Sequence, residues 1–174
     1  MELKKRVVGV VGLGHVGAHV AFVLGMMGIA DEVKICDCNA QKAESERQDL
    51  MDAVMFMPHR VTYTIADYAD LKDCDVIVNA VGDINLCATG NRDDEMEYTV
   101  AQVADYVPKV MAGGFDGIFV NITNPCDVIT DLIAKKSGLP KGAYWAPARD
   151  WIRPALSVPS YSRRAWNTTP SRPT

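Results

Sequence analysis

The stretch VVGVVGLGHVGAHV, residues 7–20, joins an apolar run to a glycine-rich turn and then to a segment with helical spacing. The apolar run, Arg6–Val11, is typical of a parallel strand that is buried on both faces of a sheet. After the turn, apolar residues recur every three or four positions until Gly28, where a helix is expected to stop. We therefore expect a strand, a tight loop and a helix.

The same alternation continues along the chain. We expect strands at 31–37, 60–65, 73–82 and 117–124 and helices at 40–55, 93–112 and 126–136. Alternation of this kind predicts an α/β fold with a doubly wound, parallel Rossmann sheet. We count five strands of an expected six. Ligands bind such sheets at the carboxyl ends of the strands, so the loops after strands one, two, four and five are the candidate site.

The turn has the pattern GxGxxG, formed by Gly12, Gly14 and Gly17. The first glycine permits a sharp turn, the second lets a pyrophosphate approach the backbone, and the third allows close helix–strand packing. The helix that follows directs its first N–H groups at the phosphates. We expect this loop, including His15 and Val16, to bind a dinucleotide.

An acidic residue ends the second expected strand. Asp37 lies 25 positions after Gly12, and a carboxylate there accepts hydrogen bonds from ribose hydroxyls and repels a 2′-phosphate. The pattern favours NAD over NADP. Enzymes that use S-adenosylmethionine also combine a glycine loop with an acid, and at this point they remain the main alternative.

Composition narrows the class of protein. The chain has a net charge of −4, which gives no reason to expect nucleic acid or an acidic membrane surface as a partner. The basic and then apolar start resembles a signal peptide, but histidines and glycines interrupt it, and we expect no membrane span.

The five cysteines match no zinc template. Cys36 and Cys38 could form a metal or redox pair, but the first is better explained as a small strand residue. We expect no metal site and a reducing, cytoplasmic location.

The later loops carry a more specific signal. The segments NAVGDINLCATGNRDDEM (79–96) and VNITNPCDVIT (120–130) resemble the mobile loop and the segment after strand five in NAD-dependent L-2-hydroxyacid dehydrogenases, the lactate/malate dehydrogenase family. The resemblance covers residues 1–142. It implies that Arg92 closes over the substrate and polarises its carbonyl, and that Asn124, supported by Pro125 and Asp127, bonds the substrate oxygen and orients the nicotinamide. It also implies that Ala80–Gly82 line the cofactor.

The resemblance extends to the substrate. In this family a loop position five or six residues before the arginine selects the substrate, and Leu86 and Cys87 stand there. Their apolar side chains imply an aliphatic L-2-hydroxy acid, and the chain is most similar to L-2-hydroxyisocaproate dehydrogenases. Family members are homo-oligomers that act on small 2-hydroxy and 2-oxo acids.

The last 32 residues have a different composition. Residues 1–142 carry 13 basic and 21 acidic side chains, whereas 143–174 carry five arginines, one acid and all three tryptophans. The family's GTGTxLDxxR segment should follow GLPKG (138–142), and neither this segment nor the acid–base histidine of a GEHG segment is present. Read one base out of register, however, the codons of Ala143–Pro154 force Leu-Gly and Leu-Asp at the family's spacing. We therefore expect an NAD-binding domain at 1–142 and an irregular tail at 143–174, with no substrate domain. The hidden motif favours an out-of-frame tail, and a Pro/Arg-rich disordered tail or an insertion is the alternative.

Two functions follow from this sequence. The first is the NAD-binding part of an oxidoreductase that transfers a hydride between NAD and an aliphatic 2-hydroxy acid. The 174-residue chain is then expected to be inactive, because the acid–base histidine and the carboxylate-binding arginine are missing. The alternative is a non-catalytic NAD-binding fragment or pseudoenzyme.

Overall fold

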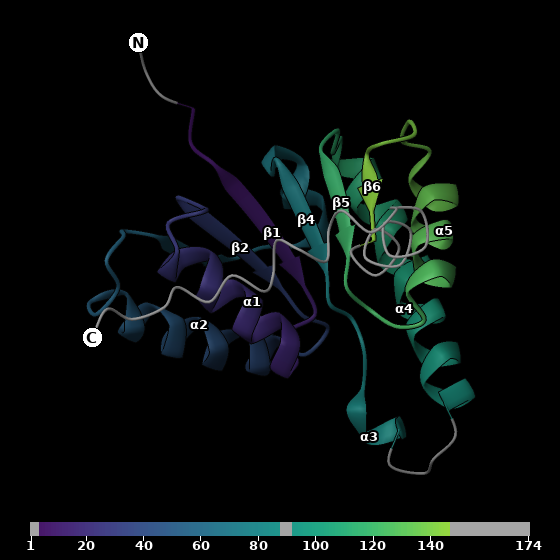
Figure 1. Cartoon of the computed structure of the whole chain (residues 1–174), viewed down its shortest axis with the longest axis horizontal. Coiled ribbons are helices and arrows are strands. Elements are labelled where there is room, and N and C mark those ends of the chain that lie inside the picture. Colours follow the sequence, from purple (N-terminus) through teal and green to yellow (C-terminus); the bar gives the residue numbers. More distant parts are fainter. Residues whose placement is uncertain (1–3, 88–91, 147–174) are drawn as a thin grey trace, which may run out of the picture.

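The computed structural model describes residues 4–87 and 92–146. Its centre is a parallel sheet with the strand order β3-β2-β1-β4-β5-β6 (Figure 1). The strands are β1 (Val7–Val11), β2 (Glu32–Cys36), β3 (Thr62–Ile65), β4 (Val76–Asn79), β5 (Ile118–Asn121) and β6 (Tyr144–Trp145). The order reverses beside β1, and a crevice between the carboxyl ends of β1 and β4 is the usual ligand site of such a sheet.

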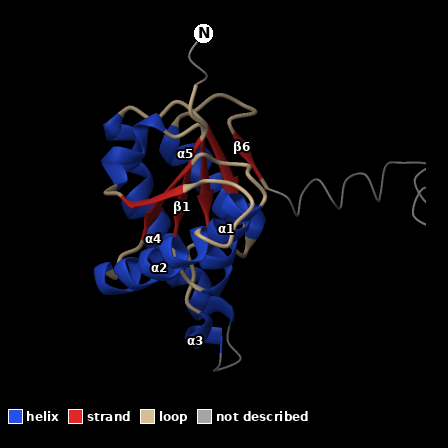
Figure 2. Cartoon of the chain, turned by 90° about the vertical axis from the view of Figure 1, so that its left-hand side faces the viewer, coloured by secondary structure: helices blue, strands red, loops and turns tan. Residues whose placement is uncertain are grey.

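Helices cover both faces of this sheet, as Figure 2 shows. They are α1 (His15–Met26), α2 (Ala40–Val54), the 3₁₀ helix η1 (Tyr68–Asp73), α3 (Ile84–Cys87), α4 (Arg92–Gly113) and α5 (Cys126–Ser137). Within the described chain no helix combines the length and the hydrophobicity that a bilayer crossing requires. The Rossmann fold class predicted from the sequence is confirmed.

The side chains of alternate strand residues pack into two separate hydrophobic cores, one on each face of the sheet. In β1, Val7 and Val11 pack with α4, α5 and η1, whereas Val8 and Val10 pack with α1 and α2. All five residues of β1 are buried, because side chains of successive strand residues point to opposite faces. This double burial explains the uninterrupted apolar run that predicted the strand.

The prediction of five strands is wrong by one short strand. Tyr144 and Trp145 pair in parallel with Phe119 and Val120 of β5, and the Phe119 N–H donates to the Ala143 carbonyl at 2.8 Å. The edge of β5 offers backbone groups that a neighbouring segment can bond whatever its side chains are. The first residues of the segment predicted to be an irregular tail are therefore ordered as β6, while 147–174 lie outside the described residues.

Two short helices were not predicted. The 3₁₀ helix η1 spans six residues, about two 3₁₀ turns, and α3 spans four. Both are too short to show a 3.6-residue period. The long helices and the strands match their predicted ranges to within a few residues.

Candidate functional site

The first and third glycines of the loop are required by close packing. Gly12 has φ of +90°, and a Cβ there would lie 2.8 Å from backbone atoms of Ala80 and Val81. A Cβ on Gly17 would lie 1.8 Å from the carbonyl oxygen of Gly12. The loop thus rests on the residues that follow β4, and α1 starts directly against the loop.

The second glycine faces open space. No heavy atom lies within 4 Å of the position that a Gly14 Cβ would take, and Gly14 lines a cavity of about 300 Å³. Its backbone angles, φ −64° and ψ −176°, are available to other residues. The absence of a side chain at Gly14 therefore keeps the cavity open and is not demanded by the backbone.

The carboxylate of Asp37 lies at the end of β2, beside the same loop. One oxygen accepts the N–H of Leu13 at 2.7 Å, and the other accepts the N–H of Asn39 at 2.9 Å. Each carboxylate oxygen can accept a further hydrogen bond. Asp37 is thus held in place by the backbone and can still receive hydroxyl groups from a ligand.

Polar groups from four segments surround this cavity. Its lining comprises Val11, Gly12, Gly14, Asp37, Cys38, Asn39, Lys42, Tyr68, Val81, Gly82, Asp83, Asn85, Tyr98, Gln102 and Tyr106. Burial raises the pKa of Tyr68 to about 12, and burial, together with the neighbouring Cys38, raises the pKa of Tyr98. Both phenols are therefore neutral hydrogen-bonding groups at neutral pH.

The two thiols of the CxC sequence lie apart. Cys36 is buried and donates to the Ala66 carbonyl at 2.7 Å, and burial raises the pKa of its thiol to about 12. Cys38 is exposed, with its sulfur 3.7 Å from the Asp37 carboxylate. Cys36 is thus a strand residue with an unreactive thiol.

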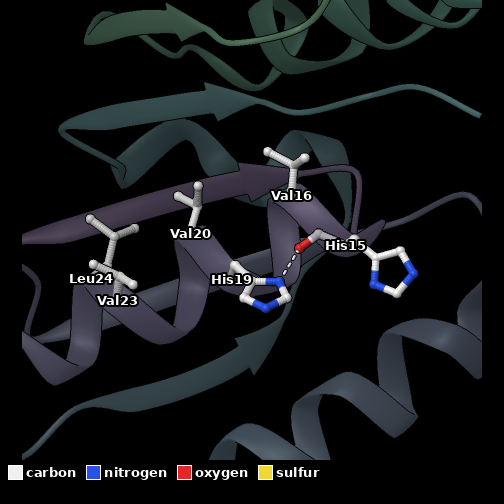
Figure 3. A pocket seen from close by; sticks show the side chains of 6 residues that line it. All are labelled: His15, Val16, His19, Val20, Val23 and Leu24. Atoms are coloured by element: carbon white, nitrogen blue, oxygen red, sulfur yellow. Dashed lines mark hydrogen bonds between the residues drawn. The ribbon is translucent and has the colours of Figure 1, made fainter. Parts of the chain in front are cut away.

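The side chains of His15 and Val16 do not line the polar cavity. They lie on the outer face of α1, beside a second, largely aliphatic hollow (Figure 3). Toward the polar cavity, the groups of these two residues that remain are their backbone N–H groups at the start of α1.

The residues predicted on the substrate side fall in and around the loop after β4 and the turn after β5. Leu86 is half-buried in α3. Arg92 is the first residue of α4, but its side chain and that of Cys87 lie outside the described side chains. Asn124 is exposed and precedes α5, with a cis peptide bond to Pro125.

A buried polar network, not predicted from the sequence, holds the ends of β4 and β5. The Tyr106 hydroxyl donates to Asn79 Oδ1 at 3.0 Å, and Asn79 Nδ2 donates to Asn121 Oδ1 at 2.8 Å. Asn121 Nδ2 in turn donates to Thr130 Oγ1 and to the Cys126 carbonyl, both at 3.0 Å. The network connects α4 with the turn that carries Asn124. Asparagine is depleted in strands, so Asn at the end of two apolar strands was the signal that could have revealed it.

With this geometry established, comparison with known proteins identifies the family. The family model described as "lactate/malate dehydrogenase, NAD binding domain" matches residues 6–144. The chain belongs to the lactate/malate dehydrogenase family. It is 39% identical over 139 residues to an L-lactate dehydrogenase of Fusobacterium nucleatum, covering 80% of this chain and 43% of the relative. It is 41% identical over 141 residues to L-lactate dehydrogenase 1 of Bifidobacterium longum, covering 81% and 44%.

Solved structures give the same family. The minor L-lactate dehydrogenase from Enterococcus mundtii, in its ligand-bound form, matches with a TM-score of 0.76 at 31% identity, covering 89% of this chain and 52% of that one. A lactate dehydrogenase from a Medee basin deep-sea metagenome library matches with a TM-score of 0.73 at 30% identity, covering 81% and 45%. The chain thus spans less than half the length of the curated relatives it matches.

The family membership indicates NAD as cofactor, and the residues present fit it. The open position at Gly14 leaves room for a pyrophosphate beside the first turn of α1, where backbone N–H groups are directed. Asp37 lies at the end of β2 on the wall of the same cavity. S-adenosylmethionine, the alternative left open by the glycine loop alone, is not supported by the family.

Removing one hydroxyl from the buried network is expected to destabilise the fold. Tyr106→Phe deprives Asn79 of a donor in a fully buried site, and the free energy of unfolding should fall by about 1–3 kcal/mol. Urea unfolding followed by circular dichroism measures the change.

The matched control is Tyr68→Phe. It keeps the ring that stacks on Tyr106 at 5.5 Å and removes a hydroxyl that takes no part in the network. We expect a change within about 0.5 kcal/mol. Equal losses in the two variants would show that the hydroxyl of Tyr106 in the network contributes no more than the hydroxyl of Tyr68 outside it.

Proposed function

We propose that this chain is the NAD-binding part of an oxidoreductase that interconverts an aliphatic L-2-hydroxy acid and its 2-oxo acid. The observation that carries the proposal is the cavity between the glycine loop and Asp37, in a domain of the lactate/malate dehydrogenase family. Bound NAD would supply the hydride acceptor. The glycine loop would hold its pyrophosphate, and Asp37 its ribose hydroxyls. Ala80, Val81 and Gly82 would form the wall after β4.

The substrate would meet residues from two loops. Arg92 would place a cation against the carbonyl oxygen, where negative charge develops during hydride transfer. Asn124 would donate to the same oxygen and orient the nicotinamide side. Closure of the loop that precedes α4 would exclude water from the reaction.

The substrate class is inferred from Leu86 and Cys87. Leu86 is apolar and half-buried, and by the family resemblance it would stand at the position that selects the substrate. An apolar pocket favours a branched aliphatic side chain over the short or carboxylated side chains of pyruvate and oxaloacetate. We therefore propose a specificity of the L-2-hydroxyisocaproate type.

Residues 143–174 are proposed to be translated one base out of frame. The family match ends at residue 144, next to Gly142, where the shifted codons begin to encode the family's segment. On this proposal the 174-residue polypeptide binds NAD without turnover. A non-catalytic NAD-binding protein is the alternative, and parallel NADH titration and assay of 2-oxo acid reduction distinguish it from an active enzyme.

The cellular setting follows from the same chemistry. The described Cys36, Cys38, Cys74 and Cys126 form no disulfide, which suits a reducing cytoplasm. A small 2-hydroxy acid is the expected substrate, and neither nucleic acid nor a membrane is expected as a partner. Self-association, as the family resemblance implies, is proposed for the whole protein.

Asp37 should set the preference between the two nicotinamide cofactors. Asp37→Asn keeps an acceptor for the Leu13 N–H and removes the charge that would repel a 2′-phosphate. We expect the ratio of the NADPH and NADH dissociation constants to fall by ~10- to 100-fold, as removal of a like-charge contact implies. NADH and NADPH fluorescence titrations measure both constants.

The control for this ratio is Asp49→Asn, which removes an exposed carboxylate on α2. The ratio of the NADPH and NADH dissociation constants of this variant should equal that of the parent chain. If Asp37→Asn also left the ratio unchanged, the carboxylate would not face the adenosine ribose and the proposed orientation of NAD would be wrong.

A further inference from the structure

Two histidines lie one helical turn apart on the outer face of α1. His15 is the first residue of the helix and His19 follows four positions later, so the two side chains share a face. Both are exposed. Both line a hollow of about 460 Å³ on α1 (Figure 3), and neither is among the residues that line the polar cavity described above. The proposed cofactor chemistry uses neither imidazole.

The hydrogen bond of His19 decides which of its ring nitrogens is available. Nδ1 lies 2.5 Å from the carbonyl oxygen of His15. A carbonyl oxygen can only accept, so Nδ1 carries the proton, and in the neutral ring Nε2 keeps its lone pair. In Figure 3 this Nε2 is directed away from the helix backbone. Metal-ligating histidines are commonly held in this way, with one ring N–H on a backbone carbonyl and the other nitrogen on the ion.

The second imidazole can reach the same ion. In Figure 3 the His15 ring extends past the start of the helix, and its exposure leaves it able to change rotamer. Side chains four residues apart have Cβ atoms about 5–6 Å from each other, a separation that two imidazoles can span with one ion between them.

The surroundings favour one class of ion. The hollow is lined by His15, Val16, His19, Val20, Val23 and Leu24, with no Lys, Arg, Asp or Glu among them. Two neutral nitrogen donors suit Zn²⁺, Co²⁺, Ni²⁺ or Cu²⁺, whereas Mg²⁺ and Ca²⁺ prefer oxygen. The helix dipole opposes a cation at this end of α1, so a moderate affinity is expected.

We propose that His15 and His19 form a bidentate site for a divalent transition-metal ion on the outer face of α1. Water completes the coordination shell. The cysteine spacings predict no metal site, and the histidine pair lies outside any such cysteine pattern. The observation that supports the site is the hydrogen bond from Nδ1 of His19 to the His15 carbonyl, which leaves Nε2 of His19 available to a metal ion.

Calorimetric titration of the untagged 174-residue protein with Ni²⁺, at about pH 8, tests the site. We expect one ion per chain. His15→Gln and His19→Gln should each lower the affinity by ~10²-fold or more, because a second ligand on the same rigid face acts at high effective concentration. The affinity lost in the double variant should be much smaller than the product of the two single losses. This non-additivity distinguishes chelation from two independent surface histidines.

Two controls complete the experiment. His59→Gln alters a histidine near Gly28, beyond the other end of α1, and Cys38→Ser removes an exposed thiol. Both should keep the parent affinity, and circular dichroism should show every variant folded. Loss of Ni²⁺ binding in either control would overturn the proposal. So would a His15→Gln or His19→Gln variant that binds Ni²⁺ with the parent affinity, or one that binds about half as many ions per chain as the parent does.

Discussion

Gly17→Ala is expected to lower the free energy of unfolding by about 3 kcal/mol or more, at the upper end of what overpacking costs. The new Cβ would lie 1.8 Å from the carbonyl oxygen of Gly12 and 3.0 Å from its carbonyl carbon. Both are backbone atoms and cannot rotate away. The helix α1 must therefore move off the loop, and with it the contacts that α1 makes to the sheet. Urea unfolding of the purified variant measures the loss.

Gly14→Ala is the matched control, three positions earlier in the same loop. The added methyl group meets nothing within 4 Å, and the backbone angles suit alanine. Its stability should stay within about 0.5 kcal/mol of the parent. Affinity for NADH should nevertheless fall by ~10-fold or more, because the methyl group stands where the pyrophosphate approaches.

These two variants separate packing from binding. If Gly17→Ala were as stable as Gly14→Ala, the close approach of α1 to the loop would be wrong. If Gly14→Ala bound NADH as tightly as the parent, the pyrophosphate would take another path.

The second large effect concerns activity. The 174-residue polypeptide should bind NADH and reduce no aliphatic 2-oxo acid above background. Its sequence holds no GEHG-type histidine, and general acid–base catalysis alone contributes ~10²- to 10⁴-fold. The rate of NADH oxidation with a branched 2-oxo acid measures this, and an Arg92→Ala variant of the same polypeptide provides the background. Turnover above that background would contradict the prediction.

A polypeptide with the reading frame restored after Gly142 is the complementary test. It should reduce the 2-oxo acid, and Arg92→Ala in that context should lower kcat by ~10²- to 10³-fold, as loss of an electrostatic contact to the reacting oxygen implies. The DNA downstream of the codon for Gly142 provides an independent check. A locus with no frame that encodes a GEHG-type segment would exclude the frameshift.

Much of the fold followed from local patterns. The continuous apolar runs of β1 and β4 are explained by burial on both faces, and Gly28 and Gly138, both with positive φ, lie just after the helices they end. The short helices α3 and η1 were missed because they span only four and six residues. The glycine loop was predicted because its three glycines form the GxGxxG pattern, which can be recognised in the sequence.

The candidate site was predictable in part. Asp37, Gly12 and Gly14 line one cavity, as the position of each after a strand suggested. The outward direction of the His15 and Val16 side chains was not predictable, because it depends on how α1 packs against the sheet. The positions of Arg92 and Asn124 relative to a substrate rest on the family resemblance.

The sequence by itself determined the order of the first five strands and the long helices, the dinucleotide loop and the family. Each of these depends on residues close together in the chain or on a motif of fixed spacing. Only the tertiary structure decided the sixth strand and the Asn79–Asn121 pair. The pair joins side chains 42 positions apart, and β6 forms because the edge of β5 supplies backbone partners to Tyr144 and Trp145. Such contacts leave no local pattern, since what specifies them is a partner that folding brings near.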